Sequence, residues 1–195
     1  MKNKTKNIGL YMGSFNPIHN AHIDIAIKSL DFVDEVWIIV SPQNPMKDVK
    51  DLAEEAHRLN MVKLASKNQL RLVPSDVEFS MDKPNYTYLT LRKLPKNDYE
   101  YTIIMGSDCL NSINKWENWT EIIKYPIICY IRDNQKIEKY VYDLIKSKIV
   151  NITFIKSDLI LSSTTIRQLI KDDKTINGLV PSSVETYIQI NSLYK

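Results

Sequence analysis

Short apolar runs alternate along this chain with stretches of helical spacing, and this alternation limits the possible folds more than any other feature. Runs rich in β-branched and aromatic residues that lack a regular apolar–polar alternation are typical of strands buried on both faces. Such runs cover residues 8–12, 35–40, 101–105, 126–131 and 152–155, with a weaker candidate at 70–73. These segments indicate a parallel sheet that is covered by helices on both sides.

Helical spacing fills the gaps between these runs. Helices are predicted for residues 23–30, 54–65, 87–94 and 137–145, from Ser162 or Ser163 to about Lys171, and from Pro181 onward. Asn20 and Thr87 are expected at or near the caps of two of these helices. The expected fold is α/β: a Rossmann-like doubly wound parallel sheet with helices on both faces and a small C-terminal helical part, in a single domain over residues 1–195.

Parallel sheets of this kind bind ligands at the carboxyl ends of their strands, where the strand order reverses. The loops that would meet at that edge are residues 13–22, 41–52 and 106–119. In the first loop, "GSFNPIHNAH", Gly13 allows a tight turn after the strand and Pro17 stiffens the backbone. The N-terminus of the helix that follows can hold an anion, with His19 and His22 beside it. A histidine next to a phosphate tends to stay protonated, because the negative charge favours the cationic ring.

The two histidines have other interpretations as well. Histidines near a helix start are as often surface residues, or caps bonded to nearby carbonyls. A metal pair is a weaker interpretation, because His57 is the one further histidine and no carboxylate cluster lies alongside. Spacing alone therefore leaves both phosphate binding and a structural role open.

The composition is that of an ordinary globular chain and suits a small anionic substrate. The net charge is +3 and no helix has a dense basic face, so nucleic-acid binding is not expected. No apolar stretch has the length of a membrane span, and none follows the basic N-terminus as in a signal peptide. Cys109 and Cys129 have no metal or redox spacing and are interpreted as reduced thiols of a cytoplasmic protein, with a disulfide or a reactive thiol as the less favoured alternatives.

Two motifs in the chain resemble those of a known family. "GSFNPIHNAH" resembles the G-x-F-x-P-x-H-x-x-H signature of the H-x-G-H nucleotidyltransferase superfamily, and "SSTTIR", at 162–167, resembles its second signature, S-x-T-x-I-R. Within the superfamily, the chain is most similar to the bacterial nicotinate-nucleotide adenylyltransferases. The segments that carry this similarity, in the same order, are 41–47, 57–65, 84–90 and 106–119. The chain departs from the pattern at Met12, Asn16 and Ala21, which replace a common glycine, aspartate and glycine.

The resemblance implies adenylyl transfer from ATP to nicotinate mononucleotide, giving deamido-NAD and pyrophosphate in NAD biosynthesis. His19 and His22 would hold the ATP phosphates, with His22 at the α-phosphate, and Arg167 would reach the β- and γ-phosphates. An ordinary capped amphipathic helix is the alternative interpretation of the segment that carries Arg167. The other implied ATP contacts are Gly13, Ser14, Phe15, Ser163 and Thr164.

The same resemblance assigns a second set of residues to the mononucleotide. Lys47 would contact phosphate as a further catalytic residue, with a solvated surface lysine as the alternative. Trp116 would stack on the pyridine ring, with core packing as the alternative. The remaining residues implied for the mononucleotide are Ser14, Thr87, Gly106, Asp108 and Trp119.

Magnesium would be carried by the ATP phosphates rather than by a protein metal site. The expected partners are ATP and nicotinate mononucleotide, with no nucleic acid and no membrane, and a homo-oligomer is left open. One alternative function is the same transfer to nicotinamide mononucleotide. Others are a related nucleotidyltransferase, such as one acting on phosphopantetheine, and a nucleotide-binding regulator without catalytic activity.

Overall fold

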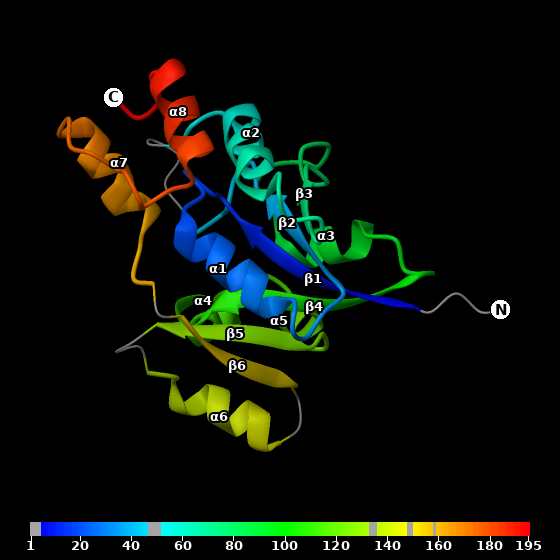
Figure 1. The fold of residues 1–195 in the computed structure, drawn as a ribbon. Helices are drawn as coiled ribbons and strands as arrows, with labels where there is room; N and C mark the ends of the chain where they lie inside the picture. Colours follow the sequence, from blue (N-terminus) through cyan, green and yellow to red (C-terminus); the bar gives the residue numbers. More distant parts are fainter. Residues whose placement is uncertain (1–4, 47–51, 133–135, 148–149, 158) are drawn as a thin grey trace.

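The computed structural model describes residues 5–46, 52–132, 136–147, 150–157 and 159–195. Its centre is a sheet of six strands, all parallel, in the order β3-β2-β1-β4-β5-β6 (Figure 1). The strands are β1 (Lys6–Gly13), β2 (Glu35–Val40), β3 (Leu72–Ser75), β4 (Tyr99–Gly106), β5 (Ile127–Arg132) and β6 (Ile152–Ser157). This strand order is that of a doubly wound Rossmann-like sheet, which confirms the predicted fold.

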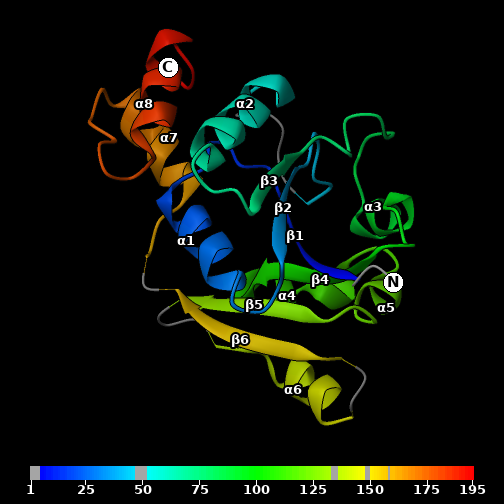
Figure 2. The ribbon, with the colours of Figure 1, turned by 45° about the vertical axis from the view of Figure 1, so that its right-hand side comes forward.

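Helices cover both faces of the sheet and separate the core into two clusters. The first cluster contains buried residues of α1 (Asn20–Ser29), α2 (Glu55–Ser66), α7 (Ser163–Lys171) and α8 (Ser182–Ile190). The second contains buried residues of α3 (Thr87–Lys93), α4 (Ser107–Asn111), the 3-10 helix η1 (Ile113–Lys115), α5 (Trp119–Ile122) and α6 (Lys139–Lys146). Figures 1 and 2 show α7 and α8 side by side near α1 and α2, as the predicted C-terminal helical part. Within the described residues, no helix combines the length and apolarity that crossing a membrane requires.

Most differences between prediction and structure lie at element ends. β3 begins at Leu72 rather than at residue 70, because Leu70 is 98% exposed and cannot contribute to the sheet core. The prediction of Asn20 as the cap of α1 was wrong: the cap is His19, and the Asn20 side chain instead donates to the carbonyl of Gly178 at 2.8 Å. α3 starts at Thr87 with Tyr86 at its cap position.

Three short helical segments, α4, η1 and α5, lie where the sequence predicts only a loop. The longest of them has five residues, which is too short for apolar residues to repeat at helical spacing. They follow one another after β4: α4 begins directly at the carboxyl end of β4, whereas α5 lies nearer the start of β5 (Figure 2).

The strand order reverses between β1 and β4, which lie side by side although two strands and three helices separate them along the chain. From β1 the chain moves outward to β2 and β3, and then returns to β4 on the other side. The loops after β1 and β4 therefore diverge to opposite faces and leave a crevice at the carboxyl end of the sheet. The fold places the predicted ligand edge at this point.

A buried carboxyl joins the segments next to this crevice. Glu78 is 2% exposed, and its Oε1 accepts a hydrogen bond of 2.7 Å from the hydroxyl of Thr90 on α3. Burial raises the pKa of Glu78 above its usual value, while hydrogen bonds from the hydroxyls of Thr90 and Ser41 partly oppose the shift. A carboxyl group in this environment favours the neutral form.

Replacing Glu78 with Gln should make the free energy of unfolding less dependent on pH. The native protein keeps a proton on Glu78 at pH values above 4.5 at which the unfolded chain has released it, so wild-type stability falls as pH rises through this range. Relative to the wild type, Glu78→Gln should therefore gain stability between about pH 4.5 and about pH 8. Urea unfolding at both pH values measures this change. Glu100→Gln, at an exposed position on β4, is the matched control, and an equal wild-type–mutant difference at both pH values would contradict the assignment.

Candidate active site

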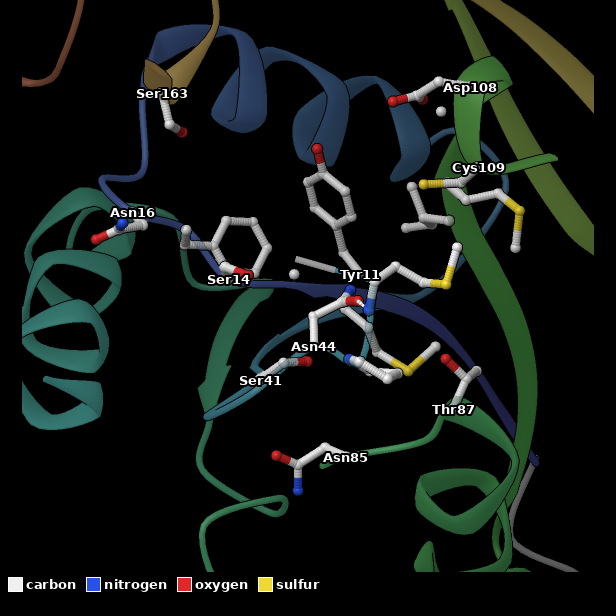
Figure 3. A pocket seen from close by; sticks show the side chains of 18 of the residues that line it. Tyr11, Ser14, Asn16, Ser41, Asn44, Asn85, Thr87, Asp108, Cys109 and Ser163 are labelled. Carbon is white, nitrogen blue, oxygen red and sulfur yellow. Dashed lines mark hydrogen bonds between the residues drawn. The ribbon is translucent and has the colours of Figure 1, made fainter. Parts of the chain in front are cut away.

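A cavity of about 850 Å³ opens at the carboxyl ends of β1 and β4. It is lined by the loop after β1, by residues 41–46 and 85–87, by the segment after β4 and by the N-terminus of α7. Figure 3 shows Asn16 and Ser163 at one end of the cavity, Thr87, Asp108 and Cys109 at the other, and Tyr11 between them. The three loops predicted to meet at this edge of the sheet all contribute to the cavity wall.

The loop after β1 turns sharply at Phe15, whose φ of 45° lies in the left-handed region. A Cβ at Gly13 would come within 3.1 Å of the Phe15 ring, so a larger residue at 13 would disturb this turn. The Phe15 ring also makes edge contacts with Tyr11 at 5.3 Å and with His22 at 5.1 Å between centroids. Gly13 therefore permits close packing of the loop on its own aromatic residue.

The two histidines cap α1 reciprocally. The main-chain N–H of His22 donates to Nδ1 of His19 at 3.4 Å, and the N–H of His19 donates to Nδ1 of His22 at 3.3 Å. Their rings are stacked, 3.6 Å apart and 17° from parallel, and both side chains line the cavity. Because Nδ1 accepts a hydrogen bond in each ring, the neutral tautomer carries its proton on Nε2, which becomes the donor. Capping and anion binding are thus compatible roles for this pair.

The N-terminus of α7 approaches the same loop. Ser162 caps the helix by accepting from the N–H of Thr165 at 3.1 Å, as the sequence predicts. The hydroxyl of Ser163 donates to the carbonyl of Pro17 at 2.9 Å, and Nη1 of Arg167 donates to the carbonyl of Asn16 at 2.9 Å. Ser163, Thr164 and Arg167 all line the cavity, so the two sequence motifs, far apart in the chain, share one site.

The residues implied for the mononucleotide divide into two groups. Ser14, Thr87, Gly106, Asp108 and Trp116 line the cavity. Trp119 is half-buried, packs against the second core cluster and is not among the lining residues. Lys47 lies outside the described residues. A Cβ at Gly106 would collide with the Asp108 carboxylate and approach the Tyr130 ring within 3.1 Å, so a larger residue there would displace these side chains.

Several cavity residues were not identified from the sequence. Asn85 fixes the cavity wall: its N–H donates to the carbonyl of Gln43 at 2.9 Å, and its Oδ1 accepts from the N–H of Gln43 at 3.1 Å. Its Nδ2 donates to the carbonyl of Glu78 at 3.2 Å. An isolated asparagine beside a proline has no sequence pattern that would indicate this role. Tyr11, which also lines the cavity, lies within an apolar run that indicates only a buried strand.

Arg58 is a further residue that the sequence did not identify. Its side chain, on α2, is 1% exposed and donates to main-chain carbonyls of two loops. Nη1 donates to Ser14 at 2.8 Å and to Ser41 at 2.6 Å, Nη2 to Pro42 at 2.9 Å, and Nε to Ala53 at 2.8 Å. Arg58 thereby holds the loops after β1 and β2 together behind the cavity.

The two cysteines are free thiols, as the sequence predicts. Cys109 lines the cavity, and Cys129 lies below it on β5, where burial raises the pKa of its thiol to about 12. A thiol in this environment stays protonated near neutral pH and is a poor nucleophile.

Comparison with known proteins identifies the family. The family model described as cytidylyltransferase-like matches residues 10–169. The probable nicotinate-nucleotide adenylyltransferase of Flavobacterium psychrophilum is 41% identical over an alignment that covers 96% of this chain and 98% of that protein. The corresponding protein of Clostridium acetobutylicum is 35% identical, with 97% and 99% covered.

A solved structure supports the fold. The nicotinic acid mononucleotide adenylyltransferase of Plasmodium falciparum, in complex with NaAD, superposes with a TM-score of 0.79 at 24% identity and covers 97% of each chain. At this identity the likeness establishes the shared architecture, while the curated relatives establish the family. The chain therefore belongs to the cytidylyltransferase-like family and, within it, to the nicotinate-nucleotide adenylyltransferases.

Proposed function

We propose that this protein transfers the adenylyl group of ATP to nicotinate mononucleotide and forms deamido-NAD and pyrophosphate, as a step of NAD biosynthesis. The observation that carries the proposal is the shared cavity, whose lining includes His19, His22 and Arg167 together with Trp116. The names of the relatives give the substrate class. We further propose that residues 1–195 act as one nucleotidyltransferase domain, in the cytoplasm, without nucleic-acid or membrane partners.

The reaction needs positioning and charge stabilisation more than it needs a base. A phosphate oxygen of the mononucleotide, already ionised at neutral pH, attacks the α-phosphorus of ATP. A new P–O bond forms while the bond to the β-phosphate oxygen breaks, and pyrophosphate leaves with the electron pair. The side chains around the reacting phosphorus therefore have to align two anions and stabilise the charge on the oxygens.

Each end of the cavity has a distinct part in this mechanism. His22 would donate from Nε2 to an α-phosphate oxygen, with His19 beside it and the positive end of α1 behind both. Arg167, with Ser163 and Thr164, would hold the β- and γ-phosphates. Main-chain N–H groups of residues 13–15 would complete the phosphate contacts. Thr87 and Asp108 would orient the mononucleotide while Trp116 stacks on its pyridine ring.

Magnesium fits this site as a phosphate-bound ion. Within the part of the chain that the structure describes, the acidic side chains that line the cavity are Glu78, Asp108 and Glu117. Among the described residues, no group of three or more His, Cys, Asp or Glu side chains gathers to hold a metal. A magnesium ion would therefore take most of its ligands from ATP and water, and would supply charge neutralisation for the departing pyrophosphate.

A turnover assay tests the proposed function. Pyrophosphate release should be fast with ATP and nicotinate mononucleotide, and much slower when nicotinamide mononucleotide replaces the acid. Equal rates with both acceptors would refute the preference for the acid. ATP binding without pyrophosphate release from either acceptor would favour a nucleotide-binding regulator.

Replacing His22 with Ala should lower kcat by about 10²-fold to 10³-fold, because a donor to the charge that develops in the transition state is lost. His57→Ala is the matched control, since His57 lies on α2, with Nδ1 2.9 Å from the Tyr187 hydroxyl, and does not line the cavity. Circular dichroism verifies that both variants fold. Unchanged turnover in folded His22→Ala would remove this residue from the mechanism.

Replacing Trp116 with Ala should raise KM for the mononucleotide several-fold and leave KM for ATP nearly unchanged, because a stacking face is lost from one subsite only. Steady-state kinetics with each substrate varied in turn measures this split. Trp119→Ala tests whether Trp119 contacts the mononucleotide or only packs in the core. A similar rise in KM for the mononucleotide would support the sequence-based assignment of Trp119 to that substrate. An unchanged KM would support its packing in the second core cluster.

A further inference from the structure

The last residues of the chain turn back toward the cavity after α8 ends at Ile190. Ser192 and Tyr194 have φ values of 50° and 68°, and the N–H of Leu193 donates to the carbonyl of Ile188 at 3.1 Å. Leu193 and Tyr194 then pack against the first core cluster, which contains residues of α1, α2 and α7. The C-terminus is thus folded onto the domain and lies beside α8, on the side of α7 (Figure 1).

Tyr194 ends this turn with a hydrogen bond to the loop after β1. Its hydroxyl donates to Oδ1 of Asn16 at 2.8 Å. The same oxygen accepts from the N–H of Ala53 at 3.1 Å, and Asn16 itself is only 6% exposed. The penultimate residue of the chain therefore contacts a residue that lines the proposed phosphate site.

Three carbonyls of this loop accept hydrogen bonds from side chains elsewhere in the fold. Arg58 donates to Ser14 at 2.8 Å, Arg167 to Asn16 at 2.9 Å, and Ser163 to Pro17 at 2.9 Å. Carbonyl oxygens carry partial negative charge and repel phosphate, so a phosphate-binding loop must hold its carbonyls in place against donors. Tyr194 donates instead to the side chain of the loop residue Asn16, at the same oxygen that accepts from the N–H of Ala53.

The surroundings of the Tyr194 hydroxyl keep it a donor. Burial raises the pKa of Tyr194 well above its usual range, while the positive charges of Arg167 and Arg58 oppose this shift. Both guanidinium groups therefore lie near the phenol, and the phenol remains protonated at neutral pH. The hydrogen bond to Asn16 is maintained across the pH range in which the enzyme would act.

We propose that Tyr194 is a positioning residue of the adenylyl-transfer site, which acts through Asn16 to hold the loop of residues 13–19 in its ATP-binding conformation. Only the kinetic test of this inference rests on the proposed function. The measurement of ATP affinity tests the inference independently. Tyr194 lines no part of the cavity and would not touch substrate.

The test replaces Tyr194 with Phe, which keeps the packed ring and removes the one hydroxyl. The dissociation constant for ATP, measured by isothermal titration calorimetry, should rise about fivefold, as expected for one lost hydrogen bond in a pre-arranged site. KM for nicotinate mononucleotide should stay within about a factor of two, because most of the residues proposed for that subsite, apart from Ser14, lie on other segments. Tyr142→Phe, at an exposed position on α6, is the matched control and should change neither constant.

A double-mutant cycle tests whether the effect passes through Asn16. In an Asn16→Ala background, Tyr194→Phe should cause no further loss of ATP affinity, because its acceptor is already absent. An undiminished effect in that background would overturn the proposed route. A lower Tm for Tyr194→Phe with unchanged ATP affinity would also overturn the proposal, because it would show that the tail only stabilises the fold.

The proposed function is tested separately, with the wild-type protein. Absence of pyrophosphate release with either mononucleotide would refute the adenylyl transfer, while the ATP titration of the variants would still decide the role of Tyr194. Weakened ATP binding in Tyr194→Phe, with a normal Tm, would support the positioning role in either case.

Discussion

The guanidinium group of Arg58 is the interaction on which the rest of the site depends. It is buried behind the cavity, and the acceptors of its hydrogen bonds within the described residues are main-chain carbonyls of Ser14, Ser41, Pro42 and Ala53. Burial lowers its pKa, and the nearby charge of Glu55 partly opposes that shift. A buried cation is costly unless its donors are satisfied, and these carbonyls provide that compensation. Arginine suits the position because its planar group reaches several acceptors at fixed angles, which an ammonium group cannot do.

The sequence predicted the parts of this molecule that local patterns determine. Buried strands lack alternation, helices show their spacing, and ligands bind where parallel strands reverse, so the sheet and its functional edge followed from the order of segments alone. That the segments 13–22 and 162–167 share a site was implied by the resemblance to the nucleotidyltransferases rather than by a local pattern, and the structure brings both to one cavity. Features that local sequence patterns specify depend little on contacts with residues far away in the chain. The prediction of the parallel sheet, which is such a feature, was confirmed.

The sequence could not predict contacts that depend on the folded path of the chain. Asn20 was expected to cap α1 because asparagine is a strong capping residue, yet His19 has the extended backbone of a cap, with φ of −141°, and takes that role. Trp116 and Trp119 both pack against the second core cluster, and Trp116 also lines the cavity whereas Trp119 does not, a difference that their shared polar segment does not indicate. Arg58 and Tyr194 act on residues far away in the chain, and no spacing indicates such pairs.

The charge balance around residue 16 follows from these distant contacts. Two cationic groups, Arg58 and Arg167, bond to the loop after β1, and the loop side chain between them is the neutral amide of Asn16. An aspartate at this position would offset part of their positive charge and would accept the same hydrogen bond from Tyr194. The carboxylate of Glu55 offsets part of the charge of Arg58. The same carboxylate lies 2.6 Å from the ammonium group of Lys83, so its negative charge acts on two cations. The asparagine therefore leaves a larger positive potential at the end of the cavity where a triphosphate would bind, since an uncompensated cation in a partly dry site acts over several ångströms.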